Sequence, residues 1–320
     1  PRRSETNIVA KFPRNPRQPV EAPVFGRVTA GHGRHHFVTT ETGETFEAHR
    51  RGKKGDVVVG DLVHCTEPVS GVAAIEAIEP RKSLLYRSDE WRIKTLAANV
   101  EQVAIVFASR PSFNPWFIWK ALLAAHQADL PALVIRNKKD LLDEAETADD
   151  AVALLREIGH DVVEVSAVAD PEGTVATLKP RFEGKATLLV GQSGMGKSTI
   201  LNLLVPYAEA ATREFSEALN LGRQTTTAAR WYDLARCGGS GAVVDTPGFQ
   251  EFGLAHLTLL DILRAMPDIA KHVEGCRFFN CRHLDEPGCS VKRAVEEGLI
   301  RPERYEFYAA LARTAQSGPM

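Results

Sequence analysis

The 320-residue sequence contains no apolar run of the length that a membrane span requires. Its first segment, Pro1 to Pro19, is polar and basic, so the apolar stretch of a secretory signal peptide is missing as well. These two absences predict a soluble, cytoplasmic protein with no membrane partner. The hydrophobic content of 44% is sufficient for the cores of two or three domains.

Cysteine is scarce, and its five copies are unevenly placed: Cys276, Cys281 and Cys289 lie within fourteen residues of one another. In a reducing compartment, clustered cysteines bind metal more often than they form disulfides. Cys65 and Cys237 are isolated and are interpreted as ordinary buried thiols.

The net charge is only −2, but residues 1–60 hold eleven Lys or Arg against six Asp or Glu. A basic end on a nearly neutral protein points to a polyanionic partner. Charge alone is equally consistent with a solvated N-terminal arm. Four prolines and no periodicity in residues 1–22 predict that this arm is mobile.

The chain is organised around a glycine-rich turn that follows the apolar run 186–190 and leads into an apolar-periodic helix from Thr199. A strand, a G-x-x-x-x-G-K-[ST] turn and a helix form a phosphate loop, whose backbone N–H groups surround phosphate. Lys197 is predicted to contact the β- and γ-phosphates, and Ser198 to bind Mg²⁺. The predicted nucleotide-binding residues here are Gly191, Gln192, Ser193, Gly194, Met195, Gly196, Lys197, Ser198 and Thr199.

Short strands separated by turn signals predict a small β-barrel between Pro23 and about Pro80. An OB-fold is the commonest nucleic-acid-binding barrel of this size, and an SH3-like barrel is the alternative. Basic loop residues would be placed for phosphates. The expected strands are 24–29, 36–40, 45–48, 61–66 and 72–78, and the basic loop residues are Arg34, His35, Arg50, Arg51, Lys53 and Lys54.

Residues 81–100 are predicted to be a connector, after which strands alternate with helices in the pattern of a mostly parallel, doubly wound α/β sheet. Four polar motifs begin where strands end, so they are expected to converge at one crevice. They are Asn137-Lys138-Lys139-Asp140, Ser166-Ala167, the phosphate loop and Asp245-Thr246-Pro247-Gly248.

The Asn137–Asp140 motif matches the guanine-reading signature of GTPases. The Asp140 carboxylate can accept hydrogen bonds from the ring N–H and the amine of guanine, a donor pair that adenine lacks. Such a site can reject an analogue without those donors by about 10⁴-fold. Asn137 would brace the loop, and the stem of Lys138 would lie over the base.

Asp245 and Gly248 match the motif that reaches Mg²⁺ through water and touches the γ-phosphate. Within Thr225-Thr226-Thr227, one hydroxyl is expected to complete the Mg²⁺ shell, and Thr226 is the chosen candidate. The guanine motif precedes the phosphate loop, which is the reverse of the usual GTPase order. A circular permutation preserves the site when the original termini lie close together. With this permuted order, the segment after the γ-phosphate motif, near residues 249–254, continues directly into the C-terminal region, so a change of nucleotide state could move that region.

That region contains Cys276-x4-Cys281-x-His283-x5-Cys289. Three thiols and an imidazole are the preferred ligands of a tetrahedral structural zinc site, although the spacing is tighter than in paired C-x2-C motifs. A reduced cysteine cluster in a small helical cap is the alternative. Helices expected over 257–274 and 302–315 offer little core of their own, which favours a metal.

The combination of barrel, permuted GTPase motifs and Cys3His element resembles the ribosome small subunit-dependent GTPase A family, from about Phe25 to the C-terminus. The resemblance implies GTP hydrolysis stimulated by the 30S subunit during its late maturation, rRNA binding, and release afterwards. It rests also on Ala98-Asn99-Val100-Glu101-Gln102, Gly222-Arg223-Gln224-Thr225-Thr226-Thr227 and Glu251-Phe252-Gly253-Leu254.

The family usually carries His, taken to position the attacking water, where this chain has Gln224. An amide can orient water without acting as a base, so Gln224 is a catalytic candidate beside Lys197 and Thr226; a merely exposed Gln is equally consistent. Phe249 is apolar where Ras-like enzymes place their water-orienting Gln.

The predicted domains are a mobile basic arm (1–22), an OB-fold RNA-binding domain (23–85), a circularly permuted GTPase domain (86–253) and a helical zinc-binding domain (254–320). The expected ligands are GTP or GDP with Mg²⁺ and one structural Zn²⁺, and a monomer is expected. Two other functions stay open. One is an RNA-binding assembly checkpoint in which the nucleotide only sets conformation, and the other is a permuted GTPase of the large subunit.

Overall fold

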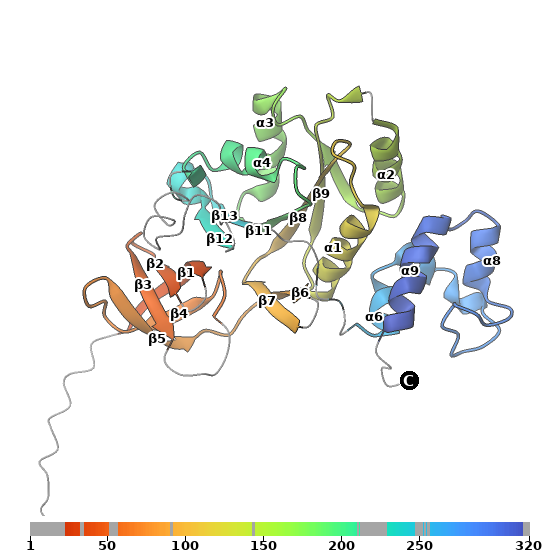
Figure 1. Cartoon of the computed structure of the whole chain (residues 1–320), viewed down its shortest axis with the longest axis horizontal. Coiled ribbons are helices and arrows are strands. Elements are labelled where there is room, and N and C mark those ends of the chain that lie inside the picture. Colours follow the sequence, from red (N-terminus) through yellow and green to blue (C-terminus); the bar gives the residue numbers. More distant parts are fainter. Residues whose placement is uncertain are drawn as a thin grey trace, which may run out of the picture.

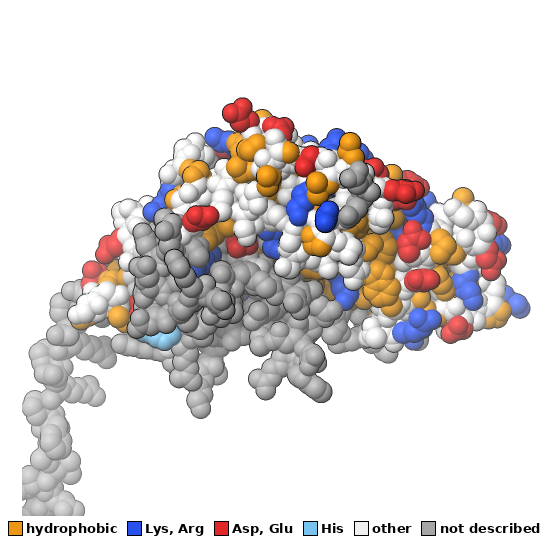
Figure 2. Space-filling view, turned by 45° about the horizontal axis from the view of Figure 1, so that its top comes forward, with side chains coloured by type: hydrophobic (Ala, Val, Ile, Leu, Met, Phe, Trp, Pro, Cys, Tyr) orange, Lys and Arg blue, Asp and Glu red, His pale blue; other side chains and the backbone are white. Residues whose placement is uncertain are grey.

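The structure is a computed structural model that describes residues 23–32, 35–50, 57–89, 92–142, 145–209, 211, 229–246, 252, 254 and 257–315. The arm predicted over 1–22 lies outside these ranges, as do nine of the eleven N-terminal Lys and Arg residues. Over the described surface, acidic and basic side chains are interspersed in Figure 2. No helix within the described ranges is long and apolar enough to cross a bilayer.

Five strands form the N-terminal barrel: β1 (Val24–His32), β2 (His35–Thr40), β3 (Thr45–Arg50), β4 (Leu62–Cys65) and β5 (Val72–Ile78). β1 pairs with β2 and with β4, and β3 runs parallel to β5, which closes the barrel. Alternate residues such as Val28, Val38 and Ala48 fill its core, as expected for strands with one solvated face. The closed order 1-2-3-5-4 confirms the OB-fold over the SH3-like alternative.

The connector predicted over 81–100 is wrong, because the structure has a hairpin there. β6 (Leu84–Asp89) pairs antiparallel with β7 (Arg92–Ala98). The polarity of this stretch is mixed, and strand formation depends on long-range packing more than on local preference. The predicted boundary at residue 85 falls within β6, and the domain limits stay predictions.

The central sheet is doubly wound, as predicted. Its strands are β8 (Gln102–Ala108), β9 (Ala132–Asn137), β10 (Asp161–Glu164), β11 (Lys185–Val190), β12 (Arg230–Asp233) and β13 (Gly241–Asp245). Their order is β10-β9-β8-β11-β13-β12, and all neighbours are parallel except β12 and β13. β8 is buried on both faces, as in the centre of a parallel sheet.

Helices cover both faces of this sheet. α1 (Pro115–Gln127) and α2 (Ala145–Glu157) share one core with one set of alternate strand residues. α3 (Pro171–Phe182) and α4 (Lys197–Leu204) share a second core with the other set. The side chain of Asn114 caps α1 by accepting from the Trp116 N–H at 3.0 Å, and Pro115 follows it as the first helical residue.

The barrel and the central sheet are joined edge to edge (Figure 1), because Ala30 of β1 pairs with Arg230 of β12. The Arg27 guanidinium lies 4.3 Å from the ring centre of Trp231. Asn99 donates to the Gly60 carbonyl at 3.0 Å. These contacts explain the Ala98–Gln102 motif as a joint between barrel and sheet.

The C-terminal helices lie at the end of the molecule opposite the barrel (Figure 1). They are α6 (Leu259–Arg264), α7 (Pro267–Ala270), α8 (Ser290–Glu296) and α9 (Pro302–Thr314). The single helix predicted over 257–274 is wrong, since Pro267 cannot continue a helix and starts a new one. This unit also has more core than its sequence indicated: Phe307 contacts Trp116 and Trp119 of α1, at ring-centre distances of 5.5 and 5.3 Å.

Candidate active site and metal centre

The phosphate loop has the backbone that its glycines predict. Gly191 directly follows β11, and a Cβ there would lie 2.3 Å from the Val106 carbonyl oxygen of β8. Gly196 is in the left-handed region at φ +94° and immediately precedes α4. Only glycine accepts both the close approach and the left-handed turn, so the loop curls back over the start of α4. This turn directs the N-terminus of α4, with its free N–H groups, to the end of the sheet.

Asn137 joins three of the predicted motifs. Its Nδ2 donates to the Met195 carbonyl of the phosphate loop at 3.0 Å. Its Oδ1 accepts from the Ala167 N–H, also at 3.0 Å. The side chain is 2% exposed, so both bonds are shielded from water. Asn137 therefore braces the guanine motif, the Ser166-Ala167 loop and the phosphate loop against one another.

Two other residues of the guanine motif, Lys138 and Asp140, also contact neighbouring loops of the site. The Lys138 ammonium donates to the carbonyls of Arg110 and Gly194, both at 2.8 Å, so its stem crosses between two loops. The Asp140 N–H donates to the Ser166 hydroxyl at 3.1 Å, and the Asp140 side chain is exposed at the mouth of the site. Lys139 is also exposed, with its ammonium 3.9 Å from Glu164.

Lys197 and Asp245 interact electrostatically within the site. The Lys197 ammonium donates to the carbonyls of Gly191 at 2.6 Å and Gln192 at 3.0 Å. Burial lowers the pKa of Lys197, and the negative charge of Asp245 opposes that shift. Burial raises the pKa of Asp245, while the positive charge of Lys197 opposes it. Each charge thus supports the other where anionic phosphates and a divalent cation would be held.

The remaining predicted residues divide into two groups. Ser198 and Thr199 lie in the first turn of α4, and Ser193 is exposed on the loop. Gln224, Thr225–Thr227 and Gly248 lie outside the described residues, so their predicted roles in water positioning, Mg²⁺ binding and γ-phosphate contact stay predictions.

Three supporting contacts were not anticipated from the sequence. The Gln192 amide oxygen accepts from the Asn114 N–H at 2.8 Å and ties the loop to the start of α1. The Glu101 carboxylate accepts from the Ala186 N–H at 2.9 Å and fixes the start of β11. The Arg136 side chain is 2% exposed and forms ion pairs with Glu164, at 2.9 Å, and with Asp149. These two ion pairs connect β9 to β10 and to α2 beneath the guanine motif. A charged residue in an otherwise apolar strand was the one signal for Arg136.

Replacing Gly196 with Ala should weaken nucleotide binding. A Cβ at this position would lie 2.2 Å from Asn137 Nδ2, in a backbone conformation that costs a residue with a Cβ about 1–2 kcal/mol. We expect the bond from Asn137 to Met195 to break, and nucleotide affinity to fall by about tenfold or more. Nucleotide titration and thermal unfolding of the same samples measure the two effects.

Gly43 provides the matched control. It has φ +87° in the turn between β2 and β3, and no atom lies within 4 Å of the position of its Cβ. Gly43→Ala should therefore carry a similar backbone strain and leave nucleotide affinity unchanged. Equal loss of affinity in both variants would show that general strain, and not the contact with Asn137, is responsible.

The predicted zinc ligands converge in the C-terminal unit. Cys276 Sγ lies 3.3 Å from His283 Nδ1 and 4.0 Å from Cys289 Sγ, and Cys289 Sγ lies 3.6 Å from His283 Nδ1. Together with Cys281 Sγ, all four donors lie within 4.8 Å of one another. Tetrahedral zinc, with bonds of about 2.0–2.3 Å, places its donors roughly 3.5–3.8 Å apart. The four side chains therefore fit a structural zinc ion.

The surrounding contacts hold these ligands in place. The Tyr305 hydroxyl donates to the His283 carbonyl at 2.9 Å, and the Tyr308 hydroxyl donates to the Arg282 carbonyl at 3.0 Å. Burial lowers the pKa of His283, with Glu286 opposing, which favours the neutral imidazole that binds metal. Burial acts to raise the pKa of Glu286, but N–H groups led by that of Arg282 outweigh it and bring the pKa to about 2.

Replacing Cys289 with Ala should remove the metal and destabilise the C-terminal unit. Zinc binding to structural sites is worth on the order of 10 kcal/mol, and part of that free energy stabilises the fold. We expect about one zinc per chain in the parent protein purified without added metal, and little in the variant. Elemental analysis and thermal unfolding test this, with Cys237→Ala as control. Cys237 lies outside the cluster, and it is exposed, so the prediction that it is a buried thiol is wrong. A metal-free parent with an ordered C-terminal unit would contradict the assignment.

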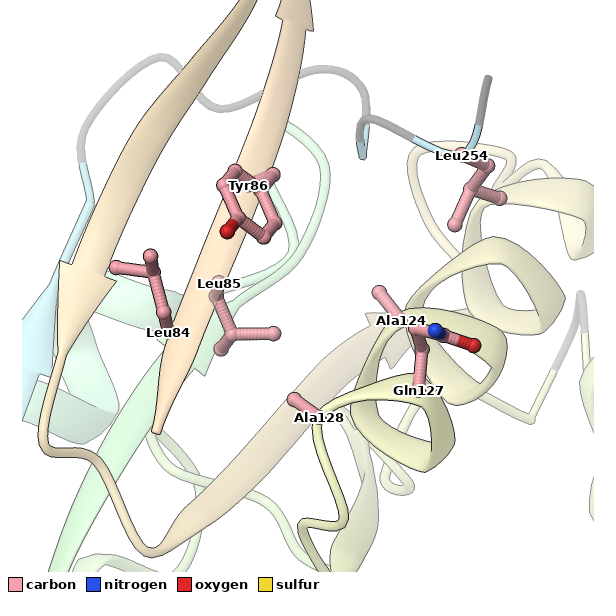
Figure 3. A pocket seen from close by; sticks show the side chains of 7 residues that line it. All are labelled: Leu84, Leu85, Tyr86, Ala124, Gln127, Ala128 and Leu254. Atoms are coloured by element: carbon pink, nitrogen blue, oxygen red, sulfur yellow. The ribbon is translucent and has the colours of Figure 1, made fainter. Parts of the chain in front are cut away.

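The segment after Asp245 leads into the C-terminal unit, as the permuted order predicts. Phe252 is 3% exposed and lies 6.2 Å from the ring centre of Phe117 in α1. Leu254 lines a cavity of about 260 Å³ between β6 and α1 (Figure 3). The other lining residues are Leu84, Leu85, Tyr86, Ala124, Gln127 and Ala128, so no predicted nucleotide-binding residue contributes to this cavity.

Known proteins resemble this chain over nearly its whole length. The family model for the RsgA GTPase matches residues 78–255. A protein of Paraburkholderia phytofirmans named small ribosomal subunit biogenesis GTPase RsgA is 45% identical over 308 residues, covering 95% of this chain and 98% of the relative. Proteins of the same name from Ralstonia pickettii and Burkholderia pseudomallei are 43% and 46% identical, each covering 91% of this chain and 93% and 92% of the relative.

Two solved structures share the fold. YjeQ from Thermotoga maritima superimposes with a TM-score of 0.65 at 29% identity, covering 93% of this chain and 100% of that protein. YloQ, described as a circularly permuted GTPase, gives a TM-score of 0.63 at 24% identity, covering 96% and 100%. The architecture of barrel, permuted α/β domain and Cys3His unit is therefore the one that the sequence predicted.

Proposed function

This chain belongs to the RsgA GTPase family, and we propose that it is a GTP hydrolase that acts in late maturation of the small (30S) ribosomal subunit. In this proposal it binds the subunit through rRNA, hydrolyses GTP when the subunit stimulates it, and is then released. We also propose that it works in the cytoplasm, where such assembly takes place, and as a monomer.

The observation that carries the proposal is the pair of hydrogen bonds made by Asn137. They connect the guanine motif to the phosphate loop and to Ser166-Ala167 within a buried network. A base-reading loop locked to a phosphate-binding loop supports recognition of one complete nucleotide. It favours GTP and GDP over ATP, because Asp140 supplies an acceptor and adenine has no matching donors.

The phosphate side of the site follows from the loop and its lysine. Residues 191–198 surround the phosphates with N–H groups, and Lys197 supplies a positive charge where charge develops on the γ-phosphate. Lys197 now donates to two carbonyls of its own loop, so it is already held near the required position. The negative charge of Asp245 opposes the lowering of the Lys197 pKa that burial causes.

We assign the magnesium site to Ser198 and Thr226, with Asp245 acting through water. The ion neutralises phosphate charge when bound. Asp245 ends β13, and its neighbour in the paired strand is Arg230 of β12. Gln224 orients the attacking water in this assignment, and Gly248 donates its N–H to the γ-phosphate.

The barrel and the C-terminal unit lie at opposite ends of the nucleotide domain, and each has a direct connection to it. β1 joins β12, and Phe252 and Leu254 join the segment after Asp245 to α1. These connections support a coupling in which nucleotide state changes the surface offered to the ribosomal subunit.

Sedimentation with purified small subunits tests the proposed cycle. The protein should pellet with the subunits when a non-hydrolysable GTP analogue is present and stay in the supernatant with GDP. ATP analogues should give no more binding than the absence of nucleotide. Equal pelleting in all nucleotide states would contradict a nucleotide-controlled association.

A further inference from the structure

The outer face of the barrel carries a second set of metal-ligating side chains, separate from the Cys3His centre and from the nucleotide site. His35 lies at the start of β2, and Glu47 and His49 lie on β3. The two strands pair with His36 opposite Ala48, which places His35 opposite His49. Ala48 and Val38 point into the barrel core, so the alternating pattern directs residues 35, 47 and 49 outward together.

The three side chains converge on one carboxylate. His35 Nδ1 lies 2.5 Å from Glu47 Oε1, and His49 Nε2 lies 3.0 Å from the same oxygen. The two imidazole rings meet edge to face, with 5.0 Å between their centres. One donor atom from each residue lies within 4.8 Å of the other two.

We propose that His35, Glu47 and His49 form a binding site for a divalent metal ion of the zinc, nickel, cobalt or copper group, and we use Zn²⁺ as the test ion. Nitrogen and oxygen ligands lie about 2.0–2.2 Å from zinc, which places tetrahedral donors roughly 3.3–3.5 Å apart. The distance of 3.0 Å between His49 Nε2 and Glu47 Oε1 is close to this range. The distance of 2.5 Å between His35 Nδ1 and Glu47 Oε1 is shorter, and rotation of these side chains would increase it when the ion binds. Two imidazoles favour zinc, nickel, cobalt or copper over magnesium or calcium.

The site is of the open kind. The side chains of His35, Glu47 and His49 are 49%, 27% and 40% exposed, so solvent reaches the ion from outside the barrel. Three protein ligands leave at least one coordination position to water or to an oxygen of another molecule. The pairing of β2 with β3 fixes the backbone on which the three ligands lie, so metal binding requires only side-chain movement.

The barrel also supplies a matched control. His64 Nε2 lies 2.5 Å from Glu79 Oε1, which is the same kind of contact as that between His35 and Glu47. That pair has no third ligand among the described residues and is not part of a metal-ligand cluster there. Comparing variants of the two sites therefore distinguishes metal binding by three ligands from the effect of losing a histidine–carboxylate contact.

Equilibrium dialysis of the full-length protein against rising Zn²⁺, followed by elemental analysis, tests the proposal. The parent should bind two zinc ions per chain, the first in the Cys3His centre and the second on the barrel. His49→Ala should lose the second ion and keep the first, while His64→Ala should bind two. Circular dichroism checks folding, and Glu47→Gln replaces His49→Ala if that variant is unfolded.

A parent protein that takes up only one zinc under these conditions would overturn the proposal and leave the cluster as a hydrogen-bonded network. Retention of the second ion by folded His49→Ala or Glu47→Gln would overturn it as well. Loss of the second ion in His64→Ala would assign the ion to a different part of the barrel and contradict the site. None of these outcomes depends on nucleotide binding.

Discussion

Replacing Asp140 with Asn should change the base preference of the site from guanine toward xanthine nucleotides. The Asp140 carboxylate accepts from two donors of guanine, whereas the amide of Asn places an N–H group against one of them. Xanthine carries a carbonyl where guanine carries its amine, so it accepts the new donor. The preference for GTP over XTP should change by about 10⁴-fold, since an unmatched buried polar group is costly.

Competition between labelled GDP and unlabelled GTP, XTP and ATP measures this change. Asp150→Asn, an exposed acid on α2, is the control and should keep the parent preference. Thermal unfolding should be nearly unchanged in Asp140→Asn, because the Asp140 side chain is exposed and its structural contact is through the backbone N–H. Tight ATP binding by the parent, or an unaltered preference in the variant, would remove Asp140 from base recognition.

Replacing Gln224 with Ala should lower GTP turnover on small subunits by roughly 10³-fold, the effect expected for a residue that completes a GTPase site. Nucleotide affinity should be nearly unchanged, because an interaction confined to the transition state does not alter ground-state binding. Turnover and affinity, measured separately on one preparation, distinguish a catalytic side chain from a structural one.

Gln224→His restores the residue that the family usually carries and should keep most of the activity or raise it. An Ala variant that hydrolyses GTP at nearly the parent rate on small subunits would show that the subunit supplies the catalytic group. Gln224 would then be an exposed residue without a catalytic role.

The parts of the site that follow local patterns were predictable from sequence. The loop at 191–198 needs glycine at fixed positions, and the guanine motif needs a strand before it; the structure has the predicted strand before each. The four zinc ligands were predicted from residue type, and the fold brings them within 4.8 Å of one another.

The parts that depend on distant contacts were not predictable. Nothing local to Gln192 indicates that its amide binds the Asn114 backbone, 78 residues earlier in the chain. The β6–β7 hairpin has mixed polarity and is stabilised by packing on α1, so its sequence was interpreted as a connector. The predicted helix over 257–274 failed because the apolar pattern continued through Pro267.

GTP turnover measured with and without purified small subunits, over a series of salt concentrations, tests whether the small subunit stimulates hydrolysis. We expect slow hydrolysis by the free protein and a large increase on adding subunits, with no hydrolysis of ATP. The increase should diminish as salt rises, because contacts with rRNA phosphates release counterions. GTP turnover that is negligible and unaffected by subunits at every salt concentration would contradict subunit-stimulated hydrolysis and favour a checkpoint in which nucleotide only sets conformation.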